Sequence, residues 1–249
     1  MQLSLDDATL RRLENLTIPT HVAVIMDGNR RWARQRGESG LEGHIAGTEA
    51  TRRLVEAAAD FGVQVLSVFA FSTENWTRND DEVQGLMALI EMALREELED
   101  LQRQEIRVVF SGRRDQLPES LQNLLTEAEA ATAANQRMTL NLCINYGGRA
   151  EIADAAAQIA RDVQQGKLDA AQIDAELFAS YMYNPQLSDP DLLIRTSGEM
   201  RISNFLLYQT AYSEIVVLPT FWPDFDAACL LEAIEQFNQR ERRFGGRKS

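Results

Sequence analysis

The residues best suited to chemistry follow a short apolar run near the N-terminus. Val22–Met26 is predicted to be a buried strand, and it leads into the polar sequence Asp27-Gly-Asn-Arg-Arg31. In open α/β sheets, ligands bind beyond the carboxyl ends of the strands. A carboxylate at this position suits a hard divalent cation, Gly28 lets a ligand approach the backbone, and guanidinium groups pair with phosphate oxygens. The pattern indicates a metal-assisted site for a phosphorylated substrate.

Two later predicted strands end in similar polar mixtures. One mixture follows Val65–Phe71 and the other follows Asp191–Arg195. Because the carboxyl ends of parallel strands lie side by side, we expect the three groups to line one crevice. The candidate side chains in the two later groups are Ser72, Glu74, Asn75, Trp76, Arg78, Arg195, Arg201 and Ser203.

Each candidate near the first strand also has a plainer interpretation. Asp27 could cap its own turn, although the adjacent arginines favour a metal or phosphate role. Arg30 and Arg31 cannot both point inward from one turn, so at least one should be a solvated surface charge. Trp32 is better explained by packing, and His44, which follows a glycine, either begins a helix or contacts a phosphate.

The later polar segments have alternatives of the same kind. Residues 72–78 are predicted to be a mobile lid over a ligand, with a static polar turn as the alternative. Arg195, Arg201 and Ser203 indicate a second anion site, or otherwise a cluster of surface ion pairs. Tyr146–Arg149 could bind an anion at a helix start, but a structural role is favoured.

Composition predicts one large domain that binds a small anion. The chain has 249 residues, 45% of them hydrophobic, and we assign residues 19–249 to an α/β domain and residues 1–18 to a flexible or helical N-terminal segment. The net charge of −13 argues against nucleic-acid binding, while arginines gathered near strand ends favour a local anion. The absence of a long apolar stretch or signal-peptide pattern predicts a cytoplasmic protein, with Cys143 and Cys229 as buried, reduced thiols.

Apolar segments and helical periodicity alternate along the chain. The strands are expected at Val22–Met26, Val65–Phe71, Ile106–Phe110, Met138–Ile144, Asp191–Arg195 and Glu214–Leu218. The helices are expected at His44–Asp60, Glu82–Gln102, Pro118–Ala133, Ala150–Gln165, Asp169–Tyr181 and Asp226–Phe244. This alternation predicts a single-domain α/β fold with a mainly parallel six-stranded sheet flanked by helices.

Several common site patterns are missing from the sequence. There is no Gly-x-Gly-x-x-Gly after the first strand, no phosphate-binding loop ending in Gly-Lys-Ser/Thr, and no Gly-x-Ser-x-Gly nucleophile turn. The residues on their own therefore indicate two anion sites, one divalent metal and a long apolar interior. They do not name the reaction.

The segment His21–Ala33 strongly resembles the first signature of the cis-prenyltransferases. Later blocks of that family match in order, so that the resemblance covers about Pro19 to Gly246 and is greatest to the bacterial undecaprenyl diphosphate synthases. The matching blocks are Gly43-His44, Ala46-Gly47, Phe71–Trp76, Arg78, Asn145–Arg149, Asp191–Glu199, Arg201–Leu207, Phe221–Phe225 and Arg240–Gly246.

The resemblance implies a reaction and a set of roles. The family repeatedly condenses isopentenyl diphosphate onto an allylic primer such as farnesyl diphosphate, with Mg²⁺ as cofactor, and grows the chain inside a hydrophobic tunnel. Asp27 would organise Mg²⁺, and Glu214 would help to complete the metal site, across a dimer interface if necessary. Met138 is our candidate for the far end of the tunnel.

The same resemblance distributes the remaining site residues between the two substrates. Arg195, Arg201 and Ser203 would hold isopentenyl diphosphate, while Asn75, beside Glu74 and Trp76, would position it and assist proton removal. Gly28, Asn29, Arg31 and Arg78 would hold the allylic diphosphate. The further substrate-binding candidates are Arg30, Trp32, Arg36, His44 and Ser72. Arg243 belongs to a tail motif that would reach the active site of the other subunit of a homodimer. A polyprenyl product implies peripheral contact with the inner face of a membrane.

The chain departs from the family pattern at one important position. Gly40 stands where the family usually has an arginine that contacts the allylic diphosphate, and Ile45 replaces a commonly basic residue. Either Arg34 or Arg36 supplies the missing contact, or allylic binding is weak. Alternatively, Gly40 is required for a positive φ angle.

Two other functions compete with this interpretation. A Mg²⁺-dependent phosphohydrolase could use Asp27 as its nucleophile, although Asn29 occupies the position of the usual second acid. A non-catalytic subunit of a heteromeric prenyltransferase should have lost the constellation of Asp27, Arg195 and Arg201, which is intact here. Chain length and the preferred primer do not follow from the sequence.

Overall fold

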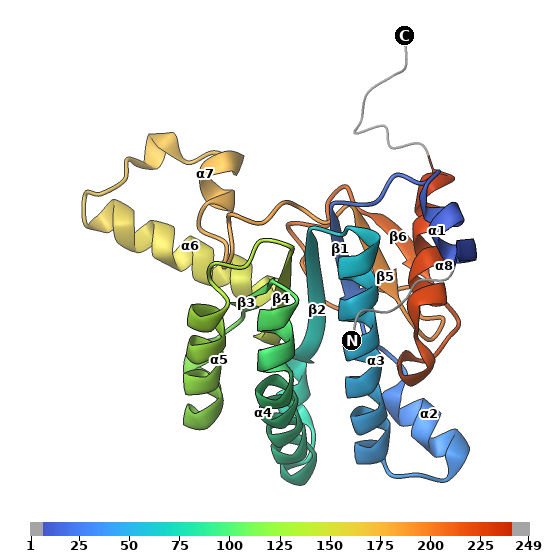
Figure 1. Cartoon of the computed structure of the whole chain (residues 1–249). Helices are drawn as coiled ribbons and strands as arrows, with labels where there is room; N and C mark the ends of the chain where they lie inside the picture. Colours follow the sequence, from blue (N-terminus) through green and yellow to red (C-terminus); the bar gives the residue numbers. More distant parts are fainter. Residues whose placement is uncertain (1–6, 241–249) are drawn as a thin grey trace.

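A computed structural model gives the structure of the chain, and it describes residues 7–240. Its centre is a six-stranded, all-parallel sheet in the order β3-β4-β2-β1-β5-β6 (Figure 1). The strands are β1 (His21–Ile25), β2 (Val65–Ser72), β3 (Ile106–Ser111), β4 (Met138–Tyr146), β5 (Leu192–Arg195) and β6 (Glu214–Val217). All six predicted strands and their parallel arrangement are confirmed, with ends that differ by one or two residues.

Both faces of the sheet are covered, which explains why its strands are almost continuously apolar. Val22 and Val24 of β1 face a large core that includes buried residues of the helices on that face, whereas Ala23 and Ile25 face a smaller cluster with Phe205. The helices are α1 (Asp7–Leu13), α2 (Asn29–Arg36), α3 (Gly40–Phe61), α4 (Asp80–Arg103), α5 (Glu119–Ala131), α6 (Gly148–Gln164), α7 (Ala175–Ala179) and α8 (Ala227–Asn238). In Figure 1, α3, α4 and α5 stand side by side in front of the sheet, and α6 and α7 project away from the body.

The strand order places a crevice beside β1. From β1 the chain runs through α2 and α3 to β2 on one side, and it later crosses to β5 on the other side. In open α/β sheets, ligands bind where the strand order reverses in this way. The carboxyl end of β1 is therefore the expected position of a binding site.

Side-chain caps mark most of the helix starts that the sequence predicts. Asn79 accepts a hydrogen bond from the Glu82 N–H at 2.8 Å, and Asp226 accepts one from the Cys229 N–H at 3.0 Å. A reciprocal pair between Ser39 and Glu42 begins α3 at Gly40, four residues before the predicted start. Each cap satisfies N–H groups that the helix itself cannot pair.

Three expectations about helices were wrong. Asn29–Arg36 forms α2 directly after Gly28, where the sequence was interpreted as a turn. Asp169–Tyr181 is not one helix, because Asp169 and Asp174 each cap a separate short helical turn. The last helix ends at Asn238 instead of Phe244, and Phe244 itself lies outside the described residues.

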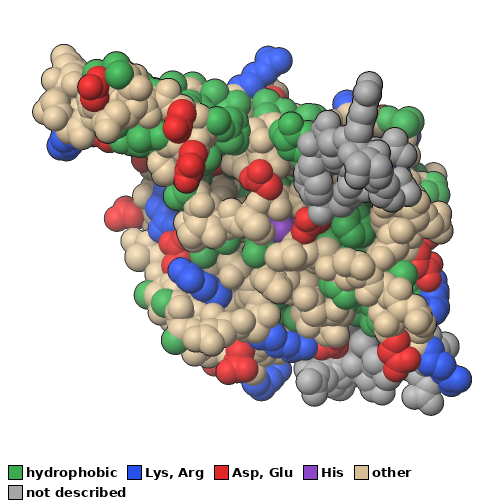
Figure 2. Space-filling model, turned by 90° about the horizontal axis from the view of Figure 1, so that it is seen from above, with side chains coloured by type: hydrophobic (Ala, Val, Ile, Leu, Met, Phe, Trp, Pro, Cys, Tyr) green, Lys and Arg blue, Asp and Glu red, His purple; other side chains and the backbone are tan. Residues whose placement is uncertain are grey.

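Other features of the composition are visible at the surface and in the core. On the face shown in Figure 2, acidic and basic side chains are interspersed, and hydrophobic side chains gather over the projecting part that contains α6 and α7. Cys143 is buried, but Cys229 is only half-buried, so the expectation of two buried thiols was half right. Within residues 7–240, no helix combines the length and the apolar character needed to cross a bilayer.

Buried polar side chains on three neighbouring strands are hydrogen-bonded to one another: His21 of β1, Ser67 of β2 and Asn141 of β4. The Ser67 hydroxyl lies 2.8 Å from His21 Nε2 and accepts a hydrogen bond from the Asn141 amide at 3.0 Å. His21 Nδ1 contacts the Ser188 carbonyl, which can only accept, so Nδ1 carries the proton and Nε2 accepts from Ser67. Burial lowers the pKa of His21 to about 4, against the opposing effects of Ser188 and Asp191.

We predict that His21 makes the protein less stable in mild acid. The pKa of His21 is 6.5 in the unfolded chain and about 4 in the folded chain. The contribution of the neutral imidazole to the stability of the fold is therefore complete above pH 6.5, and it is lost as the pH falls toward 4. Between pH 7 and pH 5 the free energy of unfolding should fall by about 2 kcal/mol because of this group. Urea denaturation at both pH values measures the fall.

The variant His21→Gln, which cannot titrate, is the control for this prediction. Between pH 7 and pH 5, the free energy of unfolding of this variant should fall by about 2 kcal/mol less than that of the wild-type protein, whatever its absolute stability. The subtraction matters because burial also lowers the pKa of the chain's other histidine, His44, to about 4. An identical fall in the two proteins would show that His21 is not responsible.

Candidate active site

Asp27 is held at the carboxyl end of β1 by its own backbone. Its N–H donates to Thr196 Oγ1 at 2.9 Å, and its carbonyl accepts from the same hydroxyl at 2.6 Å and from the Trp222 N–H at 3.0 Å. Thr196 is completely buried. These bonds join the end of β1 to the segments that follow β5 and β6, and they fix the direction of the Asp27 side chain.

Two guanidinium groups hold the Asp27 carboxylate. Arg31 Nη2 lies 3.1 Å from Oδ1, and Arg195 Nη2 lies 2.8 Å from Oδ2. Burial alone would raise the pKa of Asp27, but hydrogen bonds and charges from Arg195 and then Arg31 outweigh it and hold the pKa below its usual value. The carboxylate is therefore ionised at neutral pH and available to a cation.

Arg195 is the most deeply buried cation of the site. Only 4% of the residue is exposed, and its guanidinium also donates to the Arg201 carbonyl and, at 2.6 Å, to Ser203 Oγ. Its Nε has no protein partner. The arrangement brings Asp27, Arg195, Arg201 and Ser203 together at one point, as the sequence predicts.

The start of α2 presents backbone N–H groups without a side-chain cap beside this cluster. Gly28 precedes the helix with φ 115° and supplies no side-chain cap, so the first N–H groups of α2 are left for other partners. A side chain at Gly28 would meet Phe221 at 2.8 Å, and one at Gly47 of α3 would meet Asn29 Oδ1 at 2.5 Å. Glycine at both positions lets the neighbouring segments close around the helix start.

The first helical turn separates the two neighbouring arginines as expected. Arg31 points inward and contacts Asp27 and Glu199, whereas the Arg30 side chain is 65% exposed and lies 3.8 Å from Glu82. Trp32 and Arg36 belong to a different cluster: the Trp32 indole donates to Asp224, and the Arg36 guanidinium stacks 3.9 Å above the indole. The structure thus places these two candidates outside the cavity lining, and their substrate-binding role stays a prediction.

Two buried polar atoms beside Asp27 lack partners. Asn29 Nδ2 and His44 Nδ1 are 3.3 Å apart, while Asn29 Oδ1 and His44 Nε2 have none. Burial lowers the pKa of His44 to about 4, with Arg78 adding to the effect, so the imidazole is neutral near pH 7. Unsatisfied buried polar atoms in a native structure point to a ligand or ordered water.

A 3₁₀ helix, η1 (Thr73–Thr77), forms the wall that follows β2. Asn75 Oδ1 accepts from the Ser72 N–H at 3.0 Å, and the Trp76 indole donates to Asn145 Oδ1 at 2.7 Å. Arg78 pairs with Glu82 at 3.0 Å. The segment is therefore well hydrogen-bonded in this structure, which is the geometry of the static turn; whether it moves as a lid stays a prediction.

Many of the predicted polar residues line the mouth of an apolar cavity of about 740 Å³: Asp27, Asn29, His44, Ser72, Glu74, Asn75, Arg78, Arg195, Arg201 and Ser203. Gly28, Arg30, Arg31 and Trp76 lie outside this lining, as Trp32 and Arg36 do. The cavity lies between the sheet and helices α3 and α4, and its apolar lining includes Val55, Val68, Leu89, Leu94, Leu101 and Leu140. At the helical rise, the span from Leu86 to Leu101 corresponds to roughly 22 Å along α4. Arg52, Glu56 and Glu97 also line it, and burial raises the pKa of Glu97.

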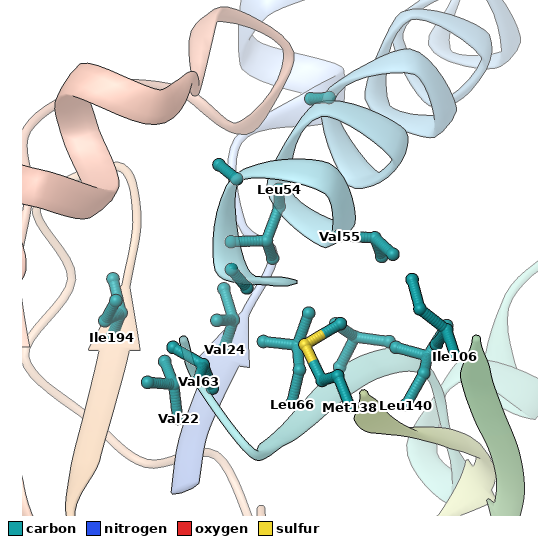
Figure 3. Close-up of a cluster of buried hydrophobic side chains, with 14 of the residues drawn as sticks. Val22, Val24, Leu54, Val55, Val63, Leu66, Ile106, Met138, Leu140 and Ile194 are labelled. Atoms are coloured by element: carbon teal, nitrogen blue, oxygen red, sulfur yellow. The ribbon is translucent and has the colours of Figure 1, made fainter. Parts of the chain in front are cut away.

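Met138 does not line this cavity. It is 2% exposed and packs in the core beside Leu66, Leu140 and Ile106 (Figure 3). Leu140, two residues further along β4 on the same face, lines the cavity instead. Met138, our candidate for the far end of the tunnel, is therefore a core residue and not part of the cavity wall.

Two predicted residues are not brought to Asp27 within one chain. Glu214 is the first residue of β6 and lies opposite Leu192, the first residue of β5. It is therefore at the amino ends of the strands, opposite the end that carries Asp27, and it pairs with Arg240 at 3.0 Å. Arg243 lies outside the described residues. Within residues 7–240, no three acidic, histidine or cysteine side chains gather into a group that could hold a metal.

The sequence did not single out three residues that complete the site. Thr196 fixes the Asp27 backbone, Glu199 pairs with Arg31 at 3.0 Å, and Asn204 donates to Glu74 at 2.7 Å. All three lie in the segment that follows β5, between or beside residues that were singled out. Their position near a polar strand end was the available signal.

Comparisons with known proteins agree with this geometry. The family model described as "Putative undecaprenyl diphosphate synthase" matches residues 25–245. The chain is 50% identical to isoprenyl transferase 2 of Bradyrhizobium diazoefficiens over 92% of this chain and 90% of that protein. It is 49% identical to a trans,polycis-polyprenyl diphosphate synthase ((2Z,6E)-farnesyl diphosphate specific) of Thermobifida fusca, over 92% and 81% of the two chains.

A solved structure shares the fold closely. Lavandulyl diphosphate synthase from Lavandula x intermedia, in complex with dimethylallyl diphosphate, superposes with a TM-score of 0.89 at 38% identity and covers 92% of this chain and 98% of that one. The family match spans most of the sequence, including all three polar strand ends of the site. A parallel sheet, a charged mouth and these similarities lead to one conclusion: the chain belongs to the cis-prenyltransferases, the enzyme family of the undecaprenyl diphosphate synthases.

Proposed function

We propose that this protein is a Mg²⁺-dependent cis-prenyltransferase that condenses isopentenyl diphosphate repeatedly onto farnesyl diphosphate. The observation that carries the proposal is the charged mouth lined by Asp27, Arg195 and Arg201, which opens into an apolar cavity of about 740 Å³, with Arg31 paired to the Asp27 carboxylate beside it. Anionic diphosphates and a growing hydrocarbon chain need these two environments side by side. The name of the Thermobifida relative specifies farnesyl diphosphate, which supports the choice of primer.

The two diphosphates would occupy different parts of the mouth. The start of α2, with Gly28, Asn29 and Arg31, offers backbone N–H groups and a guanidinium to the allylic diphosphate. Arg195, Arg201 and Ser203 would hold isopentenyl diphosphate on the β5 side. The hydrocarbon of the allylic substrate would then extend into the cavity, which excludes water from the allylic cation.

The residues at the mouth fit a magnesium ion shared with a diphosphate. Asp27 is an ionised carboxylate, and the unpartnered Asn29 Oδ1 is a second oxygen donor nearby. Mg²⁺ commonly binds through one or two carboxylates together with substrate phosphates. When bound, it would neutralise charge on the departing diphosphate. Arg31 and Arg195 hold the carboxylate in place for this task.

A homodimer at the membrane surface is the form in which we propose that the enzyme works. Glu214 lies away from Asp27 in its own chain, so a role in the metal site requires a second chain, and Arg243 would act on the partner in the same way. A polyprenyl product favours peripheral contact with the inner face of the cytoplasmic membrane. A phosphohydrolase is disfavoured by Asn29, and a non-catalytic subunit by the intact pairing of Asp27 with Arg195.

The decisive experiment is incubation with labelled isopentenyl diphosphate, farnesyl diphosphate and Mg²⁺, followed by butanol extraction and product sizing. Extractable label in long products supports the proposal. Release of phosphate without condensation would support the phosphohydrolase, and neither activity would support the non-catalytic subunit. Repeating the assay in EDTA tests the metal requirement.

We predict that Asp27→Asn lowers kcat by at least about 100-fold, because a metal-bound transition state loses several kcal/mol of charge stabilisation. Asparagine keeps the shape and an acceptor for Arg195. Initial rates over a Mg²⁺ titration measure the effect. The matched control is Asp115→Asn, the same change in an exposed acid outside the cavity lining, and it should stay active. Near-normal turnover of Asp27→Asn at high Mg²⁺ would contradict the assignment.

Arg201→Ala should raise KM for isopentenyl diphosphate by roughly 10- to 100-fold, because the substrate loses charge-assisted hydrogen bonds to the guanidinium. The Arg201 side chain is 62% exposed, so its removal should leave the fold intact. Steady-state kinetics with each substrate varied in turn provide the test. The KM for farnesyl diphosphate should change little, and an equal rise in both would assign Arg201 to general steering.

The structure excludes one of the three explanations for Gly40. Gly40 is absent from the glycines with positive φ, and a side chain there would lie 3.7 Å from the Arg30 stem, so the proposed need for a positive φ was wrong. Gly40→Ala should therefore stabilise α3 by about 0.5–1 kcal/mol in thermal unfolding.

Gly40→Arg should tighten farnesyl diphosphate binding by up to about tenfold. The new guanidinium would restore one charge-assisted contact to a phosphate, and the entropy lost in ordering the long side chain offsets part of that gain. Calorimetric titration with farnesyl diphosphate measures this, and Gly40→Ala separates the helix effect from the charge. Equal affinities for the two variants would mean that Arg34 or Arg36 already makes the contact.

A further inference from the structure

Two segments that are distant in sequence form facing walls of the cavity mouth. The η1 wall, residues 72–78, contributes Ser72, Glu74, Asn75 and Arg78 to the cavity lining. The β5 loop, residues 199–206, contributes Arg201, Ser203 and Asn204. In the proposed reaction the η1 wall carries Arg78, assigned to the allylic diphosphate, and the β5 loop carries Arg201 and Ser203, assigned to isopentenyl diphosphate. The separation of the two walls therefore sets the distance between the reacting carbons.

Asn204 joins these walls. Its side-chain Nδ2 donates to Glu74 Oε1 at 2.7 Å, and its Oδ1 accepts from the Arg149 N–H at 2.8 Å. Its backbone carbonyl accepts from the Gly148 N–H at 2.7 Å. Asn204 is therefore anchored to the start of α6 by two bonds and reaches across to η1 with a third.

The backbone around Asn204 is shaped for this contact. Ser203 has φ 47°, Asn204 has φ 63° and Leu206 has φ 45°, three non-glycine residues in the left-handed region. Such conformations cost energy and persist where the surrounding structure enforces them, often at functional sites. A side chain at Gly147 would lie 2.8 Å from Asn204 Nδ2 and 2.5 Å from Thr73 Oγ1, so this glycine keeps the space in which the walls meet.

Glu74 is in the ionised state that this bond requires. Burial would raise the pKa of Glu74, but hydrogen bonds from its own backbone and from Asn204, Ser72 and Thr73 hold it below the usual value. The carboxylate can only accept, so the direction of the bond is fixed. The opposite end of η1 is held by the bond from Trp76 to Asn145.

We propose that Asn204 is a positioning residue that fixes the η1 wall against the β5 loop and thereby sets the relative placement of the two substrates. The proposal rests on the proposed condensation for its kinetic consequences. Its structural content, that the Asn204–Glu74 bond orders η1, is independent of the reaction. Asn204 itself touches neither reacting carbon in this scheme.

The first test is Asn204→Asp. Aspartate has nearly the same shape, tolerates left-handed backbone and keeps the acceptor for Arg149, but it places a carboxylate against Glu74. We expect kcat to fall by about 10- to 100-fold, as small displacements of reacting groups do, while the KM of each substrate changes less than about threefold. Asn123→Asp, on the exposed surface of α5, is the matched control and should retain wild-type kinetics.

The second test reverses the donor and the acceptor. In Glu74→Gln/Asn204→Asp the glutamine amide can donate to the aspartate, so the bond re-forms and kcat should recover at least about tenfold relative to Asn204→Asp alone. Glu74→Gln on its own measures any direct role of the Glu74 charge. If the double variant is no faster than Asn204→Asp although Glu74→Gln is active, the coupling is absent.

A third measurement does not depend on turnover. Hydrogen exchange of peptides that cover residues 72–78 should be about tenfold faster in Asn204→Asp, the change expected for one lost charge-assisted bond, and should return to the wild-type rate in the double variant. Unchanged exchange in Asn204→Asp would overturn the proposal. If the wild-type protein does not condense isopentenyl diphosphate, the proposed function fails, and hydrogen exchange still decides the role of Asn204.

Discussion

The buried contact between Arg195 and Asp27 is the interaction on which the rest of the site depends. A guanidinium group that is almost completely buried is stable only if its charge is compensated, and Asp27 provides that charge at 2.8 Å. The same contact keeps the carboxylate ionised. Removing Asp27 would leave Arg195 as an uncompensated buried charge, whereas removing Arg195 would leave Asp27 paired with Arg31 alone.

Other parts of the mouth are arranged around this pair. The remaining Arg195 donors hold the Arg201 carbonyl and Ser203, which sets the path of the β5 loop. Thr196, the next residue, binds the backbone of Asp27 on both its N–H and its carbonyl. One buried arginine and its neighbour thus connect the ends of β1 and β5, and the strand order places both at the crevice of the sheet.

Much of the fold could be predicted because its signals are local. Strands buried on both faces are continuous apolar runs, and cap residues such as Asn79 mark helix starts directly in the sequence. The start of α2 was harder, since Asp27, Gly28 and Asn29 are as typical of turns as of helix beginnings. The prediction of one helix over Asp169–Tyr181 was wrong because the helix propensity of the whole segment is high, whereas Asp169 and Asp174 each begin a separate short helix.

The site itself was predictable in part. Polar residues at strand ends could be assigned to one crevice because parallel strands end at the same edge. The same reasoning places Glu214, the first residue of a strand, at the opposite edge, so its separation from Asp27 was already implied by the sequence. The depth of Met138 and the contact between Asn204 and Glu74 were not, because both depend on how distant segments pack.

The left-handed backbone in the β5 loop has a consequence for the mutational tolerance of this protein. Ser203 and Leu206 adopt conformations that glycine would adopt with less strain, so glycine at either position is a substitution that local energetics favour. Glycine would also release the loop from its single shape and, at position 203, remove the hydroxyl that binds Arg195. Searches for stabilised variants by relief of local strain would therefore select changes that loosen the mouth, and this segment is one that protein engineering should leave unaltered.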